Sequence, residues 1–472
     1  MAPGRPEPPA AWNAYTSRLS PNYAPRRGVR RPVRSPYTGT RPHSGAYRPP
    51  RFWFAAVPFI QYITVFEQKR GTTIELSEGI RILTEEKRII TGINLSFGNA
   101  RSCEQHCTGL IQECERMEDG SFIPCERKSE PESVYDLASV TKIFTAVSIL
   151  QLKEAGRISF DDPISKHDRR FRNLNDITVL DLLSFQKAVS TDDRIDTQKS
   201  SADALAQLFS AKPSPRPERR YYTDMGAMIL KYVIESASGT DYFSYLKDHI
   251  LSPLGMSHTY AVVPPALYPK TACYNYERRI LADGRKVLDT DCPVGTVHDP
   301  KARIISRDGS DLCGHAGLFS TIGDMTLLAQ GLLNGCILPR TLLMEMGKNR
   351  TGYRLPDGTY THYLGYLCYA KHPVQTYSEV PQCFTDGTTA LNGFTGNHFS
   401  VDPNRNMFMI HLSNRIHNRV TVATGRPDPD NHLESVMWDD GMEYPVSQNY
   451  VYYKDKHLKN PIGEILDRKY KT

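Results

Sequence analysis

Strand-like segments lie at both ends of the chain and enclose a long helical middle. Residues 79–100 carry β-branched residues at alternating positions, which predicts strands joined by a turn. Strand-like, turn-rich sequence returns near the other end, in the segments 314–321, 361–370, 389–403 and 406–414. Helices separated by polar or proline-rich loops are predicted for residues 177–186, 201–210, 226–239 and 241–256. This order predicts an α/β (α+β) fold: an antiparallel sheet assembled from both ends of the chain, flanked by helices, with an inserted all-helical lobe at about residues 156–310.

One further helix, predicted over residues 137–155, begins with a serine and a lysine three positions apart. Ser139 and Lys142 share a face of this helix, and an apolar stripe follows them before Gly156 supplies a C-terminal stop. The stripe consists of Val140, Ile143, Phe144, Val147, Leu150 and Leu152. A serine is a poor nucleophile until a nearby base takes its proton, and a lysine supplies that base only in a desolvated setting. A helix start followed by buried turns offers such a setting.

The S-x-x-K pattern occurs three times, so the tetrapeptide alone is weak evidence. Ser244 and Lys247 lie in the middle of a helix between two aspartates, which is typical of a solvated face. Ser184 and Lys187 close a helix before a polar loop and have no buried turn behind them. Only Ser139 stands at the start of a long apolar helix, where the N-terminal dipole also favours a developing oxyanion.

Several motifs in the right order give the chain a family resemblance. The segment "LASVTKIFTAVSILQLKEAGRISFDDPIS" resembles the nucleophile helix of serine hydrolases related to class C β-lactamases and low-molecular-weight penicillin-binding proteins. "YYTDMGAMILKYVIESASGTDYFSYLKDHILSPLGMSHT" is similar to the Tyr-x-Asn stretch of that family, and "GHAGLFSTIGDM" and "GFTGNHFSVDP" follow in order. The resemblance covers about residues 134–415 and implies a β-lactamase/transpeptidase-like fold.

The resemblance also implies roles for individual residues. Ser139 matches the acylated nucleophile, Lys142 its partner, and Tyr222 the tyrosine that serves as or shares the general base. Tyr221 competes for that place, but its spacing to the following helix fits less well. Asp224 stands where the family usually has asparagine, and its charge would raise the pKa of Lys142 and shift the burden of base catalysis to Tyr222.

The third family motif departs further from the pattern. Its Lys/His-Thr/Ser-Gly positions align with Leu391, Asn392 and Gly393, so the cationic residue is absent. The backbone N–H of Phe394 would form the oxyanion hole together with that of Ser139, because a main-chain donor survives side-chain changes. If Leu391 faces the cleft, recognition of a substrate carboxylate is weakened. "SFQKAVS" departs in the same direction, because relatives commonly carry a His-Thr-Ser-Gly-like turn there.

Histidine 315, between two glycines in "CGHAGLFS", has two interpretations. His315 could replace the missing cation or act as a base, but a histidine in a tight turn more often serves as a local hydrogen-bonding residue.

Charge is distributed unevenly along the chain. Residues 1–51 hold ten arginines and one acid, which gives this segment a charge of +9. Since the net charge of the whole chain is +6, the remaining residues carry −3. This Pro/Arg/Tyr-rich tail is predicted to be disordered, with RNA or anionic-surface binding as the functional alternative. The mildly acidic body beyond it is not expected to bind nucleic acid. Residues 52–420 are predicted to form the catalytic domain, followed by a C-terminal extension, 421–472.

An apolar segment, "FWFAAVPFIQYITVF" at residues 52–66, bears on the compartment of the protein. It resembles a signal-peptide core but has a long preceding region and no cleavage site, so a buried strand or capping segment is favoured. No run of 18 apolar residues is present, and no stable membrane span is expected. A cytoplasmic location is slightly favoured over attachment to the cell envelope through this segment.

Four of the ten cysteines cluster within a short stretch. Cys103, Cys107, Cys114 and Cys125, with His106 among them, lack the paired C-x-x-C spacing of zinc ribbons. Reduced cysteines in a surface insertion are favoured, with a metal site as the alternative.

These observations together predict a serine hydrolase or acyltransferase that forms an acyl-enzyme with small ester or amide substrates. The resemblance implies no metal and no organic cofactor. A D,D-peptidase or β-lactamase acting on cell-wall-type substrates is the alternative within the enzyme class. A ligand-binding relative that has lost turnover is the alternative outside it, because positions 224 and 391 depart from the motifs.

Overall fold

The computed structural model describes residues 74–215, 221–306, 311–423 and 433–470. All of them belong to one compact unit. The arginine-rich tail and the apolar segment 52–66 lie outside the described residues, so the predictions made for them remain predictions.

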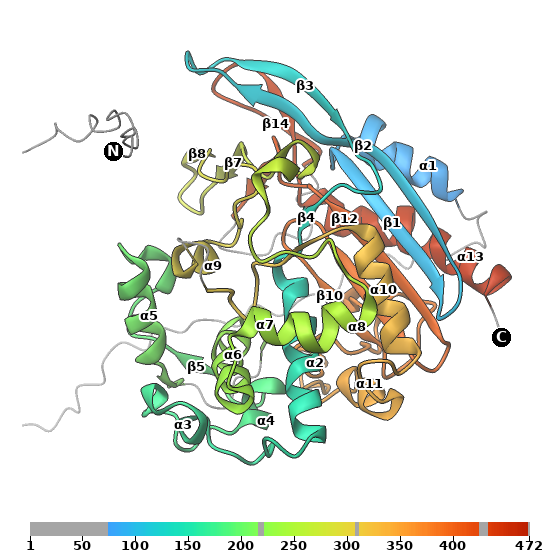
Figure 1. Ribbon diagram of the computed structural model, residues 1–472. Coiled ribbons are helices and arrows are strands. Elements are labelled where there is room, and N and C mark those ends of the chain that lie inside the picture. Colours follow the sequence, from blue (N-terminus) through green and yellow to red (C-terminus); the bar gives the residue numbers. More distant parts are fainter. Residues whose placement is uncertain (1–73, 216–220, 307–310, 424–432, 471–472) are drawn as a thin grey trace, which may run out of the picture. The chain divides into compact units, whose positions relative to one another are not determined.

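The centre of this unit is a six-stranded antiparallel sheet in the order β10-β11-β12-β1-β2-β3 (Figure 1). Three strands come from the early part of the chain and three from the late part, joined through the β1–β12 pair, in which Leu95 lies opposite His411. The strands are β1 (Gly92–Asn99), β2 (Cys103–Arg116), β3 (Phe122–Lys128), β10 (Thr389–Asn392), β11 (His398–Asp402) and β12 (Met407–Ser413). The predicted sheet assembled from both ends of the chain is confirmed.

Alternation along β1 separates the two faces of the sheet. Ile93, Leu95 and Phe97 point to one face and form a core with the first and last helices of the described chain. Ser96 points to the other face, where its hydroxyl accepts a hydrogen bond from Thr326 of α10 (Ile322–Leu333) at 2.8 Å. Because side chains alternate with period two, each face of the sheet has its own helical cover.

The start of the predicted N-terminal strand pair is helical instead. Residues 76–86 form α1 (Leu76–Arg81) and the π-helical turn η1 (Ile82–Glu86). The β-branched residues of this segment suggested a strand, but Leu76, Ile80 and Leu83 recur at helical spacing and are buried together against the C-terminal helices. Tertiary burial therefore decides against the local strand propensity.

The helix predicted over residues 137–155 consists of a 3₁₀ turn, η2 (Ala138–Val140), followed by α2 (Thr141–Glu154). An apolar stripe predicts one buried face, but α2 is buried on nearly all sides up to Leu150. It packs against α6 (Met225–Ser238) of the helical lobe and lies in the same core as Phe399 and Phe408 of the sheet. This central place explains why Lys142 is fully buried.

Helices predominate in the inserted lobe, but short strands occur in it as well. β7 (Glu277–Ile280) and β8 (Lys286–Asp289) form a hairpin that pairs in parallel with β13 (Val420–Val422), so the lobe is not purely helical. Its helices are α3 (Ile164–His167), η3 (Arg169–Phe171), α4 (Val179–Leu183), η4 (Ile195–Thr197), α5 (Ser201–Phe209), α6, α7 (Tyr242–Leu246), η5 (Lys247–Leu251), α8 (Ser252–Leu254), η6 (Pro265–Lys270) and α9 (Pro300–Ile305). The remaining elements are β4 (Tyr135–Asp136), β5 (Val189–Ser190), β6 (Lys212–Pro213), β9 (Phe319–Ser320), α11 (Arg340–Met346), η7 (Gln375–Tyr377), β14 (Ser435–Met437) and β15 (Glu443–Pro445).

The last described helices cover the sheet face opposite α10. They are α12 (Asn449–Lys454), η8 (Asp455–Lys459) and α13 (Asn460–Lys469). Leu458, Ile462 and Leu466 are buried in the same core as Leu95 and Phe97. The described part of the predicted C-terminal extension thus completes the core under the sheet.

Candidate active site

The nucleophile candidate stands on a tight turn between β4 and α2. Ala138 adopts a left-handed backbone with φ of +46°, and its N–H donates to Asp136 Oδ1 at 2.8 Å. A non-glycine residue in this region is uncommon and persists only where surrounding contacts hold it. The turn leaves Ser139 partly exposed, although its sequence neighbours are buried.

Lysine 142 lies directly behind the nucleophile. Its Nζ donates to Ser139 Oγ at 2.9 Å, to Asp224 Oδ1 at 2.7 Å and to the carbonyl of His315 at 3.3 Å. Burial lowers the pKa of this ammonium, but the charge of Asp224 and the nearby tyrosine outweigh burial, so the pKa of Lys142 is raised above its usual value. The structure therefore brings Ser139, Lys142 and Asp224 together and holds the lysine charged.

The ring of Tyr222 completes this group. It is stacked on Tyr369 with centroids 5.2 Å apart, it packs on Phe185, and Lys142 Nζ lies 4.9 Å from its centroid. Its buried hydroxyl lies close enough to Ser139 and Lys142 to interact with both side chains, but it forms no hydrogen bond of ordinary geometry with a described residue. Burial raises the pKa of Tyr222, while the Lys142 ammonium opposes this rise. A buried hydroxyl that lacks an ordinary hydrogen bond is uncommon in proteins, and a catalytic role is one of the explanations for it.

The two other S-x-x-K pairs have structural explanations. Ser184 Oγ donates to the carbonyl of Leu180 at 2.5 Å, and Lys187 forms an ion pair with Asp181 at 3.1 Å. Ser244 lies in the first turn of α7, which Asp241 caps. Neither serine has the buried lysine that Ser139 has.

The end of β10 lies against the nucleophile turn. A Cβ added to Gly393 would lie 2.7 Å from the carbonyl oxygen of Leu137, so a larger residue would collide there. Thr395 Oγ1 and Asn397 Nδ2 both donate to the carbonyl of Asp136, at 2.9 and 2.7 Å. These bonds hold the turn that contains Phe394 beside the turn that contains Ser139.

Two residues of the same strand, Leu391 and Asn392, are engaged in contacts with other parts of the chain. The side chain of Asn392 donates to Glu379 and accepts from the ring of His398, on the face covered by the C-terminal helices. Leu391 is on the other face but fully buried in the main core, with Phe399 as a neighbour in that cluster. The assumption that Leu391 faces an open cleft is therefore wrong, because β10 is covered by core packing at this position.

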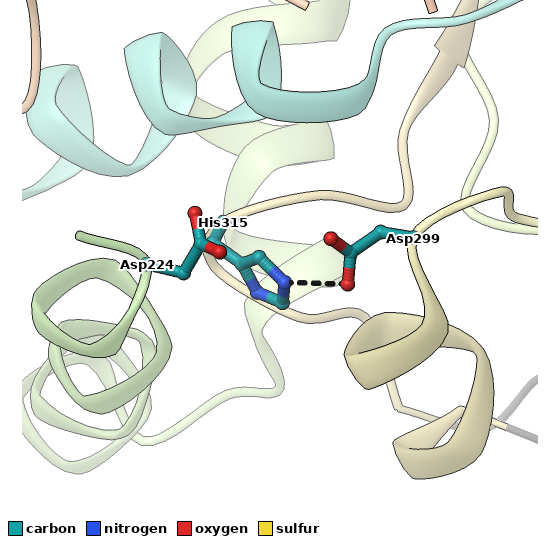
Figure 2. A group of neighbouring side chains, drawn as sticks. All are labelled: Asp224, Asp299 and His315. Carbon is teal, nitrogen blue, oxygen red and sulfur yellow. Dashed lines mark hydrogen bonds and ion pairs between the residues drawn. The ribbon is translucent and has the colours of Figure 1, made fainter. Parts of the chain in front are cut away.

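His315 does not contact Ser139 but lies behind Lys142. It is fully buried, its Nε2 lies 3.0 Å from Asp299 Oδ1, and its Nδ1 has no partner among the described residues. Figure 2 shows His315 between Asp224 and Asp299. These three side chains form the one group in the described part of the chain that has the composition and spacing of a metal site.

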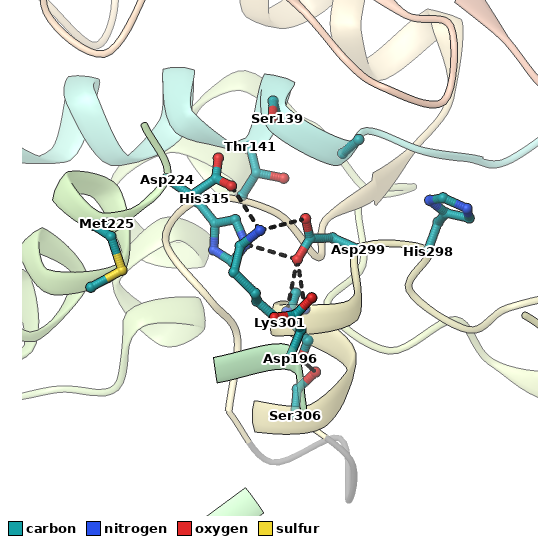
Figure 3. Close-up of polar contacts among 12 residues, drawn as sticks. Ser139, Thr141, Asp196, Asp224, Met225, His298, Asp299, Lys301, Ser306 and His315 are labelled. Atoms are coloured by element: carbon teal, nitrogen blue, oxygen red, sulfur yellow. Dashed lines mark hydrogen bonds and ion pairs between the residues drawn. The ribbon is translucent and has the colours of Figure 1, made fainter. Parts of the chain in front are cut away.

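Sequence reasoning missed Asp299 and Lys301. Asp299 caps α9 by accepting from the N–H groups of Lys301 and Ala302, and Lys301 Nζ lies 2.9 Å from Asp224 Oδ2 (Figure 3). The sequence Asp-Pro-Lys at 299–301 is a recognisable helix start. Nothing in it indicates an ion pair with a residue 77 positions earlier, since 301 − 224 = 77.

Arg415 was also not singled out. Its Nε donates to the carbonyl of Phe394 at 2.7 Å, and its guanidinium lies 5.1 Å from the centre of the Phe394 ring. Burial lowers the pKa of this guanidinium. Arg415 follows β12 at a position that no motif marks.

The clustered cysteines lie in the main sheet and not in a surface insertion. Cys103, Cys107 and Cys114 are on β2 and Cys125 is on β3. Four residues of strand separate Cys103 from Cys107 by about 13 Å, too far to share one metal ion. The absence of stoichiometric zinc stays a prediction.

Comparison with known proteins assigns the family. Residues 121–427 match the family model described as Beta-lactamase, which is more than half of the chain. The chain therefore belongs to the Beta-lactamase family, and the resemblance found in the sequence is confirmed.

Curated relatives agree with this assignment. A protein of Escherichia coli O157:H7 named "Putative D-alanyl-D-alanine carboxypeptidase" is 28% identical over 338 residues, which are 66% of this chain and 76% of the relative. A protein of the same name from Escherichia coli K12 is 28% identical over 328 residues, 64% of this chain and 73% of the relative.

Solved structures confirm the fold. A simvastatin synthase mutant from Aspergillus terreus has a TM-score of 0.56 at 16% identity, covering 83% of this chain and 97% of the other. A class C β-lactamase from Rhodobacter sphaeroides has a TM-score of 0.54 at 16% identity, covering 83% and 99%. The predicted β-lactamase/transpeptidase-like fold class is confirmed. Within the described ranges, no helix has both the length and the apolar character needed to cross a membrane.

Proposed function

We propose that the protein is a serine hydrolase or acyltransferase that works through an ester on Ser139. The observation that carries this proposal is the placement of Ser139 Oγ 2.9 Å from the Nζ of a fully buried lysine, beside the buried hydroxyl of Tyr222, which interacts with both side chains. A nucleophile in hydrogen-bond contact with a group held by further partners is the arrangement that covalent catalysis requires. Membership of the Beta-lactamase family supports the same class of chemistry.

Tyr222 is the general base in this proposal. As a phenolate, stabilised by the Lys142 ammonium, it takes the Ser139 proton while Oγ bonds to the acyl carbon of the substrate. The bond from that carbon to the leaving group then breaks, and the phenol returns the proton to the leaving group. Water or another hydroxyl or amine removes the acyl group by the same steps in reverse. Lys142 keeps its proton throughout, in line with its raised pKa.

The oxyanion of the tetrahedral intermediate is bound by two backbone N–H groups. We assign these to Ser139, at the start of its helix, and to Phe394, on the neighbouring turn. The support is the set of hydrogen bonds that ties residues 395 and 397 to Asp136 and thereby holds both turns together. Each such donor contributes about 10²–10³ in rate.

Active-site labelling tests the proposal. A fluorophosphonate should add once to the native protein, and the adduct should map by mass spectrometry to the peptide that contains Ser139. Ser139→Ala should abolish labelling, whereas Ser184→Ala and Ser244→Ala, the matched S-x-x-K controls, should label like the native protein. Labelling of Ser139→Ala at the native rate would exclude Ser139 as the nucleophile.

A D,D-carboxypeptidase is the second candidate, because curated relatives carry that name. Release of D-alanine from an acyl-D-Ala-D-Ala peptide, lost in Ser139→Ala, would support this narrower activity. Hydrolysis of simple esters with no release of D-alanine would oppose it.

A further inference from the structure

The carboxylate of Asp224 is shared between two ammonium groups. Oδ1 accepts from Lys142 at 2.7 Å, and Oδ2 lies 2.9 Å from Lys301 Nζ. The two lysines come from α2 and α9, far apart in sequence, and meet at the residue that precedes α6. A carboxylate has two oxygens and can bind one cation with each of them.

The contacts continue from Lys301 back to Lys142. Lys301 Nζ lies 3.6 Å from Asp299 Oδ2, Asp299 Oδ1 lies 3.0 Å from the ring of His315, and the His315 carbonyl accepts from Lys142. Figure 3 shows Lys301 reaching between Asp224 and Asp299. The ammonium groups of Lys142 and Lys301 thus lie beside two carboxylates, those of Asp224 and Asp299. The two negative charges are balanced by these lysines of the chain itself.

This balance also accounts for the metal-like spacing of Asp224, Asp299 and His315. The Lys301 ammonium is already within ion-pair distance of both carboxylates, where a metal ion would need to bind. An ammonium between two carboxylates supplies the compensating charge that such a cluster requires.

We propose that Lys301 is a positioning residue of the active site: it shares the Asp224 carboxylate with Lys142 and thereby allows an aspartate to serve where the family resemblance leads one to expect asparagine. An unshared aspartate would act with its whole charge on Lys142 and Tyr222, raise the pKa of the tyrosine, and leave less phenolate at neutral pH. The catalytic consequence rests on the proposed function, whereas the shared ion pair itself does not.

The surroundings of Lys301 contain a small set of charged and titratable groups. Asp224 precedes α6, Asp299 caps α9, Asp196 belongs to η4 and His315 to the loop before β9, with Lys142 of α2 beyond Asp224. Burial lowers the pKa of Lys301, but the carboxylates outweigh burial and hold it above the usual value, so Lys301 stays charged across the neutral range. Removing Lys301 therefore removes one positive charge and no proton that titrates near neutrality.

A double-mutant cycle read across pH tests the proposal. The rate of fluorophosphonate labelling of Ser139 is measured from about pH 6 to about pH 10 for the native protein, Lys301→Met, Asp224→Asn and the double variant, and circular dichroism checks at each pH that the protein is folded. Lys301→Met should shift the increase in labelling rate to a pH about one unit higher, so that the rate at pH 7 falls about tenfold. In the Asp224→Asn background the same substitution should change the rate by less than about threefold, because the shared charge is gone.

Two further variants complete the experiment. Lys301→Arg keeps the charge and should retain the native pH profile, and Lys348→Met removes a lysine from an exposed pair with Glu345 and should leave labelling unchanged. An unshifted profile in Lys301→Met, or equal losses in both backgrounds, overturns the proposal.

Thermal unfolding of the native protein, Lys301→Met, Asp224→Asn and the double variant separates this proposal from the proposed function. Lys301→Met should lower Tm more in the native background than in the Asp224→Asn background. If the native protein is not labelled at Ser139, the proposed function fails, and the Tm cycle alone then decides whether the carboxylate is shared. Equal Tm changes in the two backgrounds exclude sharing.

Discussion

At the scale of single residues, the proposed chemistry depends on where one proton resides among Ser139, Lys142 and Tyr222. Burial shifts the pKa values of Tyr222 and Lys142 in opposite directions, because it raises the pKa of a phenol and lowers that of an ammonium. The charge of Asp224 outweighs the effect of burial on Lys142, so the pKa of each group lies above its ordinary value. At neutral pH the site therefore holds a charged lysine and a mostly neutral tyrosine, and the phenolate that the proposed mechanism uses is the minor form.

The rate of Ser139 acylation should therefore rise with pH through the alkaline range. The reactive form has lost a proton from a group whose pKa in the folded protein lies above its ordinary value, so that form is scarce at neutral pH and increases as pH rises. Labelling rate against pH measures this directly. Tyr221→Phe should keep the rise, whereas Tyr222→Phe should lose it together with about 10²-fold or more of the rate. A rate that is level from pH 6 to pH 9 would contradict this assignment of the base.

At the scale of elements, the packing of α1 on the C-terminal helices is the contact that local sequence least indicates. A Cβ added to Gly79 would lie 2.1 Å from the carbonyl oxygen of His457, in the backbone of η8. Backbone cannot move aside as a flexible side chain does, so this glycine permits the close approach of the two helices.

Gly79→Ala should consequently destabilise the protein, by about 1–3 kcal/mol. Gly323→Ala is the matched control, because the nearest atom to its added Cβ is Thr321 Oγ1 at an ordinary 3.8 Å. Denaturant unfolding compares the two variants with the native protein. Equal free energies of unfolding for native and Gly79→Ala would show that α1 does not pack on η8 in this way.

Strand β10 bears on substrate choice. Leu391 offers no charge to a substrate, and its burial in the core means that a lysine placed there would itself be buried. Because β10 (Thr389–Asn392) carries no Lys, Arg or His, a substrate carboxylate gains no charge-assisted hydrogen bond, worth about 1.5–3 kcal/mol, from a side chain of this strand.

Neutral short-chain esters should accordingly be hydrolysed faster than penicillins or D-Ala-D-Ala peptides, judged by kcat/KM. If the native enzyme prefers substrates with a carboxylate, another cation supplies the contact. Lys187 is paired with Asp181 and His315 with Asp299, whereas Arg415 contacts the Phe394 carbonyl at the end of this strand. Arg415→Met would then be expected to remove the preference.

At the scale of the whole molecule, charge is separated along the chain. Residues 1–51 contribute +9 and the remaining residues −3, which gives the net +6. A truncated protein that begins at residue 52 should therefore have an isoelectric point below neutral and hydrolyse a small ester at close to the native rate. Isoelectric focusing and a steady-state assay check the two parts. Loss of folding on truncation would show that the tail is not the disordered segment that its composition predicts.

Much of the fold and the centre of the site could be predicted from the sequence. The grouping of Tyr222 and Asp224 with Ser139 and Lys142 was implied by the resemblance of several motifs to a known family. The sheet and the helix behind Ser139 followed from alternating β-branched residues and helical periodicity. These signals are short-range: a helix places residues i and i+3 on one face whatever surrounds it.

What tertiary structure alone decided involves contacts between distant segments. Residues 79–86 have strand-like composition but form helix, because burial against η8 and α13 outweighs local propensity. Leu391 lies on a strand, as its sequence context predicted, yet its burial depends on the core around it. Lys301 and Asp299 reach Lys142 only because α9 is folded against the start of α6. Charge balance in a buried site is a property of three-dimensional proximity, and no spacing along a single chain encodes it.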